Sequence, residues 1–208
     1  PAYGEDGAAR LAAGALLDTV RAALEVVDAD VIVAHTGDFG SAVWSSEIRA
    51  ALSHCRLIPQ RGDRFATRLT HAHCDAVRTG ARRVVQIGMD TPQITAAALT
   101  GALDLLDADR RVGCLGPADD GGWWALGTCH ARGTGGLGGV VMSTPTTYAD
   151  TRTVMQEAGL RVTPLPRLTD VDTAADVHVV AAQCASSSRF ADIAALLEPH
   201  PATVDGVR

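Results

Sequence analysis

Short β-branched apolar runs alternate with segments of helical periodicity along most of this chain. The runs at 30–35 and 83–88 are each followed by a turn and then by a segment of helix length. A continuously apolar strand needs cover on both faces, and regular alternation of strand and helix builds a parallel or mixed sheet between helical layers. The pattern therefore predicts an α/β fold, a three-layer α/β/α sandwich, with 83–88 as a central strand.

The remaining elements follow from periodicity, caps and turn residues. Helices are expected at 5–27, 45–52, 63–80, 95–106, 145–158, 173–185 and 188–197, and further strands near 57–58, 112–115, 123–126 and 160–165. The glycine-rich run 133–139 predicts a mobile loop. No linker or repeat interrupts the pattern, and 208 residues suit one domain.

Composition limits the classes of function. A formal charge of −6 and only three Phe, three Trp and two Tyr argue against nucleic-acid binding. No apolar run reaches the roughly 18 residues of a membrane span, and the five scattered cysteines contain no C-x-x-C pair. The chain is therefore expected to be cytoplasmic, with reduced thiols, and to need a metal ion or a local basic pocket if it binds a nucleotide.

Asp90 is the first candidate for chemistry. It follows the apolar strand 83–88 in the run Gly88-Met89-Asp90-Thr91-Pro92, and ligands of open α/β sheets bind beyond the carboxyl ends of strands. A carboxylate there suits Mg²⁺ or Mn²⁺, which use few protein oxygens together with substrate phosphates. The alternative is that Asp90 only caps the turn or the next helix.

The second candidate is the turn Asp120-Gly121-Gly122, which joins two strands and is followed by Trp123 and Trp124. Two glycines beside an acid allow a ligand to approach the backbone, although a plain hairpin turn is the alternative. Strand alternation sends one tryptophan ring to the core and the other toward the site.

Each of several further polar residues allows two interpretations of its role. Ser143 or Thr144 either caps the helix that Pro145 begins or contacts substrate. Asp170 and Asp172 share one face if the chain is extended, so one is either the second metal ligand or a helix N-cap. His71 and His73 diverge on a helix and do not form a ligand pair, which predicts one surface and one semi-buried histidine.

Five ordered segments resemble the bacterial radical-SAM/selenodomain-associated transferases of the GT-A nucleotide-diphospho-sugar transferase superfamily. Residues 60–69 (QRGDRFATRL) are similar to that family's Q-x-G-x-D-L-G-x-R-L, and 88–92 (GMDTP) to its G-x-D-x-P. Residues 116–124 (GPADDGGWW) resemble G-P-A-x-D-G-G-Y-Y, 142–144 (MST) resemble Trp-Ser-Thr, and 170–176 (DVDTAAD) resemble D-x-D-T-x-x-D.

The resemblance implies a GT-A, Rossmann-like mixed sheet with a nucleotide half, an acceptor half and a Mg²⁺ or Mn²⁺ ion held by acidic residues. Carried onto this chain, Asp90 and Asp120 are the catalytic candidates, and the metal ligands are Asp90, Asp120 and Asp172. The residues expected to bind nucleotide or substrate are Gly62, Arg68, Gly88, Thr91, Pro92, Gly121, Gly122, Trp123, Ser143 and Thr144. The expected partners are a nucleotide or nucleotide sugar and a small acceptor, and a homodimer is compatible with the pattern.

Two departures from the family change these expectations. Trp123-Trp124 replaces a tyrosine pair, which removes two hydroxyls. The family also opens with a strand and a basic A-K-x-P-x-P-G-x-x-K-T-R-L loop, which do not occur in this sequence, read as one GT-A-like domain over 1–208. Two alternatives are open: a longer native protein supplies both, or this protein has lost the loop and catalysis with it. The expectation is that such a segment carries the phosphate site and that a sheet edge is open without it.

Three functions remain open from the sequence. The first is metal-dependent transfer of a glycosyl or nucleotidyl group. The second is guanylyltransferase-like chemistry of the phospholactate type, which would turn over nucleoside triphosphates. The third is a catalytically silent domain that binds a nucleotide or a partner.

Overall fold

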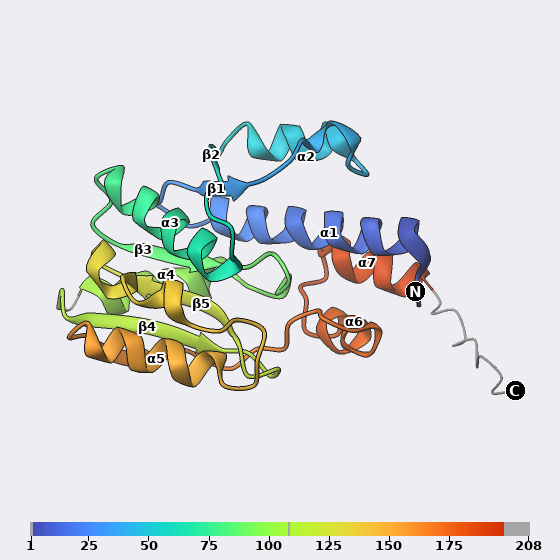
Figure 1. The fold of residues 1–208 in the computed structure, drawn as a ribbon. Coiled ribbons are helices and arrows are strands. Elements are labelled where there is room, and N and C mark those ends of the chain that lie inside the picture. Colours follow the sequence, from blue (N-terminus) through green and yellow to red (C-terminus); the bar gives the residue numbers. More distant parts are fainter. Residues whose placement is uncertain (1, 108, 198–208) are drawn as a thin grey trace, which may run out of the picture.

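A computed structural model describes residues 2–107 and 109–197 (Figure 1). Its helices are α1 (Gly4–Leu24), α2 (Ser45–Leu52), α3 (Phe65–Arg78), α4 (Ala96–Asp107), α5 (Thr147–Glu157), α6 (Ala174–Ala181) and α7 (Arg189–Leu196). Its strands are β1 (Ile32–His35), β2 (Arg56–Pro59), β3 (Val84–Ile87), β4 (Val112–Pro117), β5 (Trp123–Thr128) and β6 (Arg161–Pro164). Short 3₁₀ turns are η1 (Phe39–Ser41), η2 (Ala131–Thr134) and η3 (Leu137–Gly139).

The described strands form two sheets. β1 and β2 pair in parallel, and the second sheet has the order β3-β5-β4-β6, in which β5 is antiparallel to both neighbours and β6 is parallel to β4. This mixed α/β architecture confirms the predicted fold class. The prediction that 83–88 is a central strand is wrong, because β3 lies at the edge of the four-stranded sheet.

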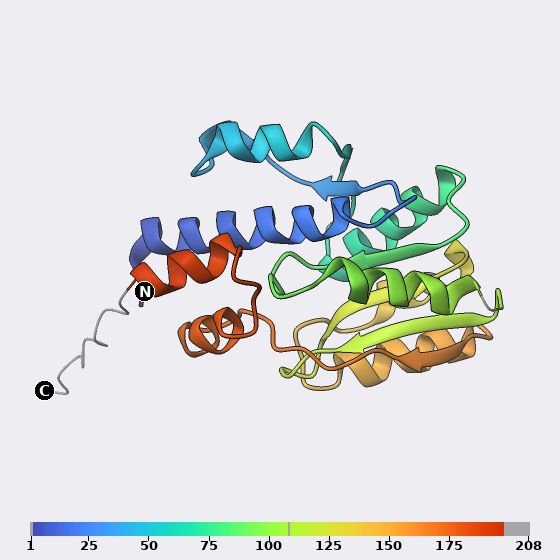
Figure 2. The same ribbon diagram turned by 180° about the vertical axis from the view of Figure 1, so that it is seen from behind.

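The four-stranded sheet is covered on both faces (Figures 1 and 2). On one face Cys114 and Trp124 pack with residues of α4 and of the end of α1. On the other face Leu115 and Leu126 pack with Met155 of α5 and with the η3 region. Neighbouring residues of one strand enter different clusters, as expected for side chains that alternate across a sheet.

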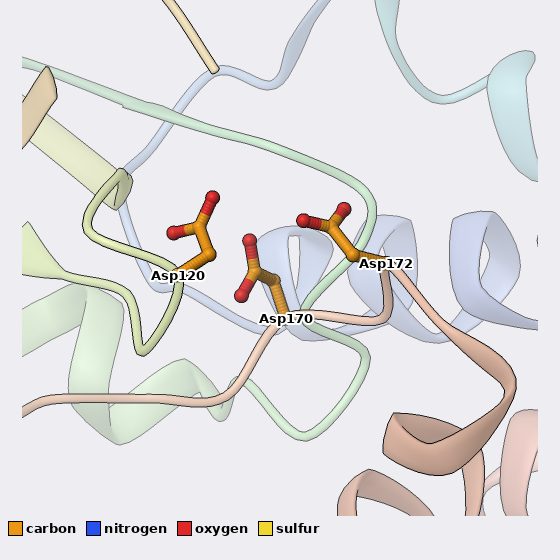
Figure 3. Close-up of side chains that lie close together, drawn as sticks. All are labelled: Asp120, Asp170 and Asp172. Carbon is orange, nitrogen blue, oxygen red and sulfur yellow. The ribbon is translucent and has the colours of Figure 1, made fainter. Parts of the chain in front are cut away.

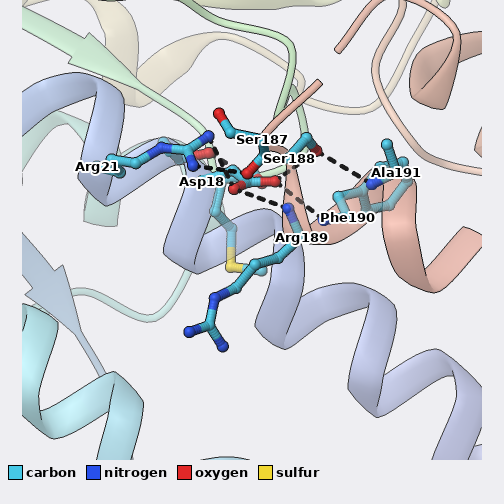
Figure 4. Close-up of polar contacts among 9 residues, drawn as sticks. Asp18, Arg21, Ser187, Ser188, Arg189, Phe190 and Ala191 are labelled. Atoms are coloured by element: carbon cyan, nitrogen blue, oxygen red, sulfur yellow. Dashed lines mark hydrogen bonds and ion pairs between the residues drawn. The ribbon is translucent and has the colours of Figure 1, made fainter. Parts of the chain in front are cut away.

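Helix α1 packs on α6 and α7 through one apolar cluster and on α2 and β1 through another. Its buried Asp18 accepts hydrogen bonds from Ser188 Oγ at 2.6 Å and from the backbone N–H of Phe190 at 2.9 Å, and Arg21 approaches it at 3.1 Å (Figure 4). Phe190 lies in the first turn of α7, where backbone N–H groups have no partner within the helix. The Asp18 carboxylate therefore accepts from a donor that the start of α7 leaves unpaired. Asp18 therefore fixes α7 on α1.

Three local expectations differ from the structure. The region 131–139 is packed into η2 and η3, with Thr134 and Leu137 buried, instead of forming a loose loop. Helix α5 begins at Thr147 rather than at Pro145. His73 is fully buried against Thr128, with 2.8 Å between His73 Nε2 and Thr128 Oγ1, and not semi-buried.

None of the described helices combines the length and the apolarity that a membrane crossing requires. The cysteines form no disulfide within the described residues, and Cys114 and Cys129 are buried in the core.

Candidate functional site

Three carboxylates meet beyond the carboxyl ends of β4 and β6. Oxygen atoms of Asp120, Asp170 and Asp172 all lie within 4.8 Å of one another (Figure 3). Asp120 comes from the β4–β5 turn, whereas Asp170 and Asp172 come from the segment between β6 and α6. We call these three residues the acid cluster.

The segment that carries Asp170 and Asp172 is held in place by backbone and side-chain bonds to both neighbouring loops. Leu168 pairs with Ala118 after β4, and Thr169 Oγ1 donates to Asp119 Oδ2 at 2.6 Å. From the other side, Gln93 Nε2 donates to the Thr169 carbonyl at 2.6 Å. The position of the acid cluster is therefore set by the ends of the strands and does not depend on one mobile loop.

The Asp120-Gly121-Gly122 turn orients the first carboxylate. Asp120 Oδ1 accepts a hydrogen bond from the Gly122 N–H at 2.6 Å. Gly121 has φ of +93°, and a Cβ on it would overlap the Pro145 carbonyl oxygen, so no larger residue fits. The turn is a hairpin, as in the alternative reading, but its acid faces two other acids.

Asp90 lies beside the acid cluster and outside it. Its carboxyl folds back over Gly88, where a Cβ would collide with Asp90 Oδ1. Its carbonyl oxygen accepts a hydrogen bond from the Val171 N–H at 2.9 Å, which joins the end of β3 to the segment of Asp170 and Asp172.

The electrostatics of the site favour a cation. The pKa of Asp170 is raised to about 6, first by burial and then by neighbouring carboxylates. Burial, followed by the charges of nearby aspartates, also raises the pKa of Asp90 and of Asp172. Among the described residues no basic side chain forms a salt bridge with the acid cluster. Three hard oxygen donors so close together fit Mg²⁺ or Mn²⁺, with water and phosphate oxygens completing the coordination.

A strained loop packs against the Asp120 turn. Ser143 has φ of +58°, which is uncommon for a residue with a side chain, and the Tyr148 N–H donates to the Gly121 carbonyl at 2.8 Å. Thr144 is bonded within this loop through its N–H, which donates to Thr147 Oγ1 at 3.0 Å. The loop therefore supports the turn, and Ser143 lies exposed next to it.

The two tryptophans separate as strand alternation predicts. Trp124 is buried in the core, and its Nε1 donates to the Pro166 carbonyl at 2.9 Å. Trp123 is partly buried and packs on the opposite face beside residues such as Met142 and Tyr148. Trp123 therefore forms part of the wall on the α3 and α5 side of the Asp120 turn.

The other predicted binding residues lie in two places. Thr91 and Pro92 are buried directly after Asp90, as part of the turn between β3 and α4. Gly62 and Arg68 are bonded to each other, since Arg68 Nε donates to the Gly62 carbonyl at 3.0 Å. No hydrogen bond or ion pair within the described residues links this pair to the acid cluster.

From the sequence, Asp170 and Asp172 are alternatives for one metal ligand, and only Asp172 enters the predicted set, whereas the structure brings both carboxylates together with Asp120. The structure also decides whether Asp170 or Asp172 is the N-cap of α6. Thr173 caps α6, and its N–H donates to the carboxylate of Asp176 in a capping box. Both Asp170 and Asp172 are therefore free of that role.

Comparison with protein families decides the classification. Residues 19–144 match a family described as "Uncharacterized protein conserved in bacteria (DUF2064)". The chain belongs to the DUF2064 family. The matched range contains β3, β4, Asp90 and Asp120. The narrower resemblance to radical-SAM/selenodomain-associated transferases stays a prediction.

Two solved structures have a similar fold. A protein from Desulfovibrio desulfuricans G20, provisionally named a nucleotide-diphospho-sugar transferase, superposes with a TM-score of 0.76 at 26% identity, over 94% of this chain and 88% of that one. A 4-diphosphocytidyl-2C-methyl-D-erythritol synthase superposes with a TM-score of 0.53 at 12% identity, over 80% of this chain and 88% of that one. Comparison with proteins of curated function finds no match. The DUF2064 chain thus has the fold of nucleotide-related transferases.

Proposed function

We propose that this DUF2064 protein is a metal-dependent transferase that acts on a nucleotide or a nucleotide sugar. The observation that carries the proposal is the acid cluster at the carboxyl end of the sheet, where folds of this type bind ligands. A net charge of −6 makes direct binding of a polyphosphate unfavourable. A divalent cation held by Asp120, Asp170 and Asp172 would remove that repulsion and stabilise charge on the leaving diphosphate.

Asp90 has a separate role in this proposal. It lies close enough to Asp120 and Asp172 for their charges to raise its pKa, but it does not belong to the acid cluster. We assign it to the substrate side of the metal, where its carboxylate positions the reacting group. Replacing Asp90 with Asn should then reduce turnover more than metal binding.

The test is a screen of the purified protein with Mg²⁺ or Mn²⁺ against the four ribonucleoside triphosphates and against UDP-, GDP- and CDP-sugars. A ligand that binds only the native state raises the melting temperature, and turnover releases either pyrophosphate or a nucleoside diphosphate. Release of pyrophosphate identifies nucleotidyl transfer, and release of a nucleoside diphosphate identifies glycosyl transfer.

Matched variants separate the site from the rest of the surface. Asp120→Asn should abolish the metal-dependent shift, whereas Asp104→Asn, which removes a mostly exposed carboxylate on α4, should leave it unchanged. A shift without turnover would support the catalytically silent alternative. No metal-dependent shift with any of these nucleotides would refute the proposal.

A further inference from the structure

The two adjacent acids of the β4–β5 turn have different surroundings. Asp120 belongs to the acid cluster, whereas Asp119 does not. Asp119 Oδ2 accepts the hydrogen bond from Thr169 Oγ1 at 2.6 Å, and Asp119 Oδ1 lies 3.8 Å from Arg167 Nη1. Asp120 Oδ1 accepts only within its own turn, from the Gly122 N–H, and no donor among the described residues engages Asp120 Oδ2. One acid is therefore directed at the protein and the other at the site.

Backbone pairing brings Asp119 and Thr169 next to each other. Leu168 and Ala118 form a parallel bridge just before them, in which the Asp119 N–H donates to the Leu168 carbonyl at 3.1 Å. The residue that follows Asp119 or Thr169 along its own segment belongs to the acid cluster. Successive side chains of extended chains point to opposite sides, so bonding and ligating positions alternate. The bond between Asp119 and Thr169 thus lies one residue away from the acid cluster on both segments.

The side chains of Asp170 and Asp172 receive no hydrogen bond from any other described residue. The direction of each carboxylate therefore depends on the backbone that carries it. On the β3 side this backbone is fixed by the Val171 N–H, which donates to a carbonyl of the β3–α4 loop at 2.9 Å. On the β4 side the adjacent side-chain link is the bond from Thr169 to Asp119. This bond therefore limits movement of the segment relative to the β4–β5 turn.

We propose that Asp119 and Thr169 are positioning residues of the metal site. Their hydrogen bond holds Asp120 and Asp170 at the separation that one ion requires, and neither Asp119 nor Thr169 contacts the ion. Outer-shell partners of this kind orient the ligands of metal centres and affect the affinity for the metal. The inference rests on the proposed metal-dependent function, and it gives Asp119 a role different from that of its neighbour.

Arg167 favours this role for Asp119. Its Nη1 donates to the Ala118 carbonyl at 2.8 Å, which keeps the guanidinium beside the Asp119 carboxylate. To become a ligand of the ion, Asp119 would have to leave both Arg167 and Thr169. The ion pair with Arg167 is exposed at both side chains and contributes little by itself. The bond from Thr169 is short and charge-assisted, and it is therefore the contact to test.

The experiment is a Mn²⁺ titration of the wild-type protein and of variants at this bond. Thr169→Val removes the donor and keeps the shape of the side chain, and Asp119→Ala removes the acceptor. Each should weaken Mn²⁺ binding about tenfold, the lower end of the effects of outer-shell partners. Thr169→Ser and Asp119→Asn retain a donor and an acceptor, so they should bind Mn²⁺ about as tightly as the wild type. The control is Thr153→Val, which removes an exposed hydroxyl that donates within α5 and should have no effect.

The double variant shows whether the two residues act through one bond. Residues that share a single interaction have non-additive effects when both are replaced. Thr169→Val combined with Asp119→Ala should therefore bind Mn²⁺ no more weakly than the weaker of the two single variants. Losses of affinity that multiply in the double variant would show two independent effects and would contradict the proposal.

Two further results would overturn the positioning role and leave the proposed function standing. The first is wild-type affinity for Mn²⁺ in Thr169→Val, which would show that the bond does not position the acid cluster. The second is a loss of binding in Asp119→Asn as large as that in Asp120→Asn, which would make Asp119 a ligand of the ion. A wild-type protein that does not bind Mn²⁺ would instead refute the metal site itself, and the positioning role with it.

Discussion

At the scale of single residues, the ionised carboxylate of Asp170 lowers the free energy of unfolding at neutral pH. The folded pKa of Asp170 is about 6, above its ordinary value of 3.8. The native state therefore binds more protons than the unfolded state between these values. Its contribution to stability is fully present below about pH 4 and is lost as the pH rises through 6. Such a cost is expected where function places like charges together.

We predict that Asp170→Asn stabilises the metal-free protein at pH 8 by roughly 1 kcal/mol, a value reduced by solvent screening of a partly exposed group. At pH 3 the difference should be close to zero, because the aspartate is then mostly protonated in both states. Urea unfolding of both proteins at the two pH values, with a chelator present, measures this. A variant that is less stable than the wild type at pH 8 would contradict the account.

His73 changes the pH dependence of stability in the opposite direction to Asp170. Burial lowers the pKa of His73 to about 4, so the folded state holds the neutral ring. Its contribution to stability is present above pH 6.5 and is lost as the pH falls toward 4, on the order of 3 kcal/mol in total. NMR of the imidazole should show no titration of His73 between pH 7.5 and 5. A midpoint near 6.5 would show that the ring is hydrated.

At the scale of elements, one buried carboxylate joins the start of α7 to α1, in addition to the apolar packing between the two helices. Asp18 accepts from Ser188 Oγ and from the N–H groups of Arg189 and Phe190. We predict that Asp18→Ala lowers the free energy of unfolding by about 3 kcal/mol, because it leaves several buried donors without a partner. Ser188→Ala removes the bond to Asp18 and the N-cap bond that the Ala191 N–H donates to Ser188 Oγ, and should cost about 1–2 kcal/mol. Equal effects in urea unfolding would show that the carboxylate is not the main acceptor.

The Asp120 turn allows a second test with a matched pair of glycines. Gly121→Ala forces a Cβ into Pro145 at positive φ and should displace the turn and weaken metal binding. Gly101→Ala, on the exposed side of α4 with open space around it, should instead stabilise the protein by roughly 0.5–1 kcal/mol. Melting temperatures with and without Mn²⁺ measure both effects. Unchanged metal binding in Gly121→Ala would separate the turn from the site.

Most elements could be predicted from the sequence, but not all of their places in the sheet. Helix α2 agrees with the predicted 45–52, because its apolar spacing is local information. The edge position of β3 was not predictable, since an apolar strand under two helical layers has the same sequence pattern at the centre or at an edge of a sheet. The packing of 131–139 was not predictable, because the buried Leu137 of this region packs against residues that are distant in the sequence.

The candidate site, too, could be predicted only in part from the sequence. Asp120 and Asp172 were proposed as ligands from the sequence, and they lie together in the structure. Asp90 was proposed with them, but only the folded loops show that Asp170 lies in the cluster and Asp90 beside it. Proximity between residues 50 positions apart is a property of the sheet topology, which sequence spacing does not contain.

At the scale of the whole molecule, the described strands form two separate sheets, and the acid cluster lies beyond the carboxyl ends of β4 and β6 of the larger one. On a protein of charge −6, the three converging carboxylates offer oxygen ligands of the kind that a divalent cation takes, which is the basis of the proposed metal site.

The most direct test of this central claim is a Mn²⁺ titration followed by electron paramagnetic resonance, which distinguishes free from bound ion. The account predicts one ion bound per chain at pH 7.5, weaker binding below pH 6 as Asp170 protonates, and loss of binding in Asp170→Asn but not in Asp104→Asn. Binding that is unaffected by Asp170→Asn, or no binding by the wild type at millimolar Mn²⁺, would contradict it.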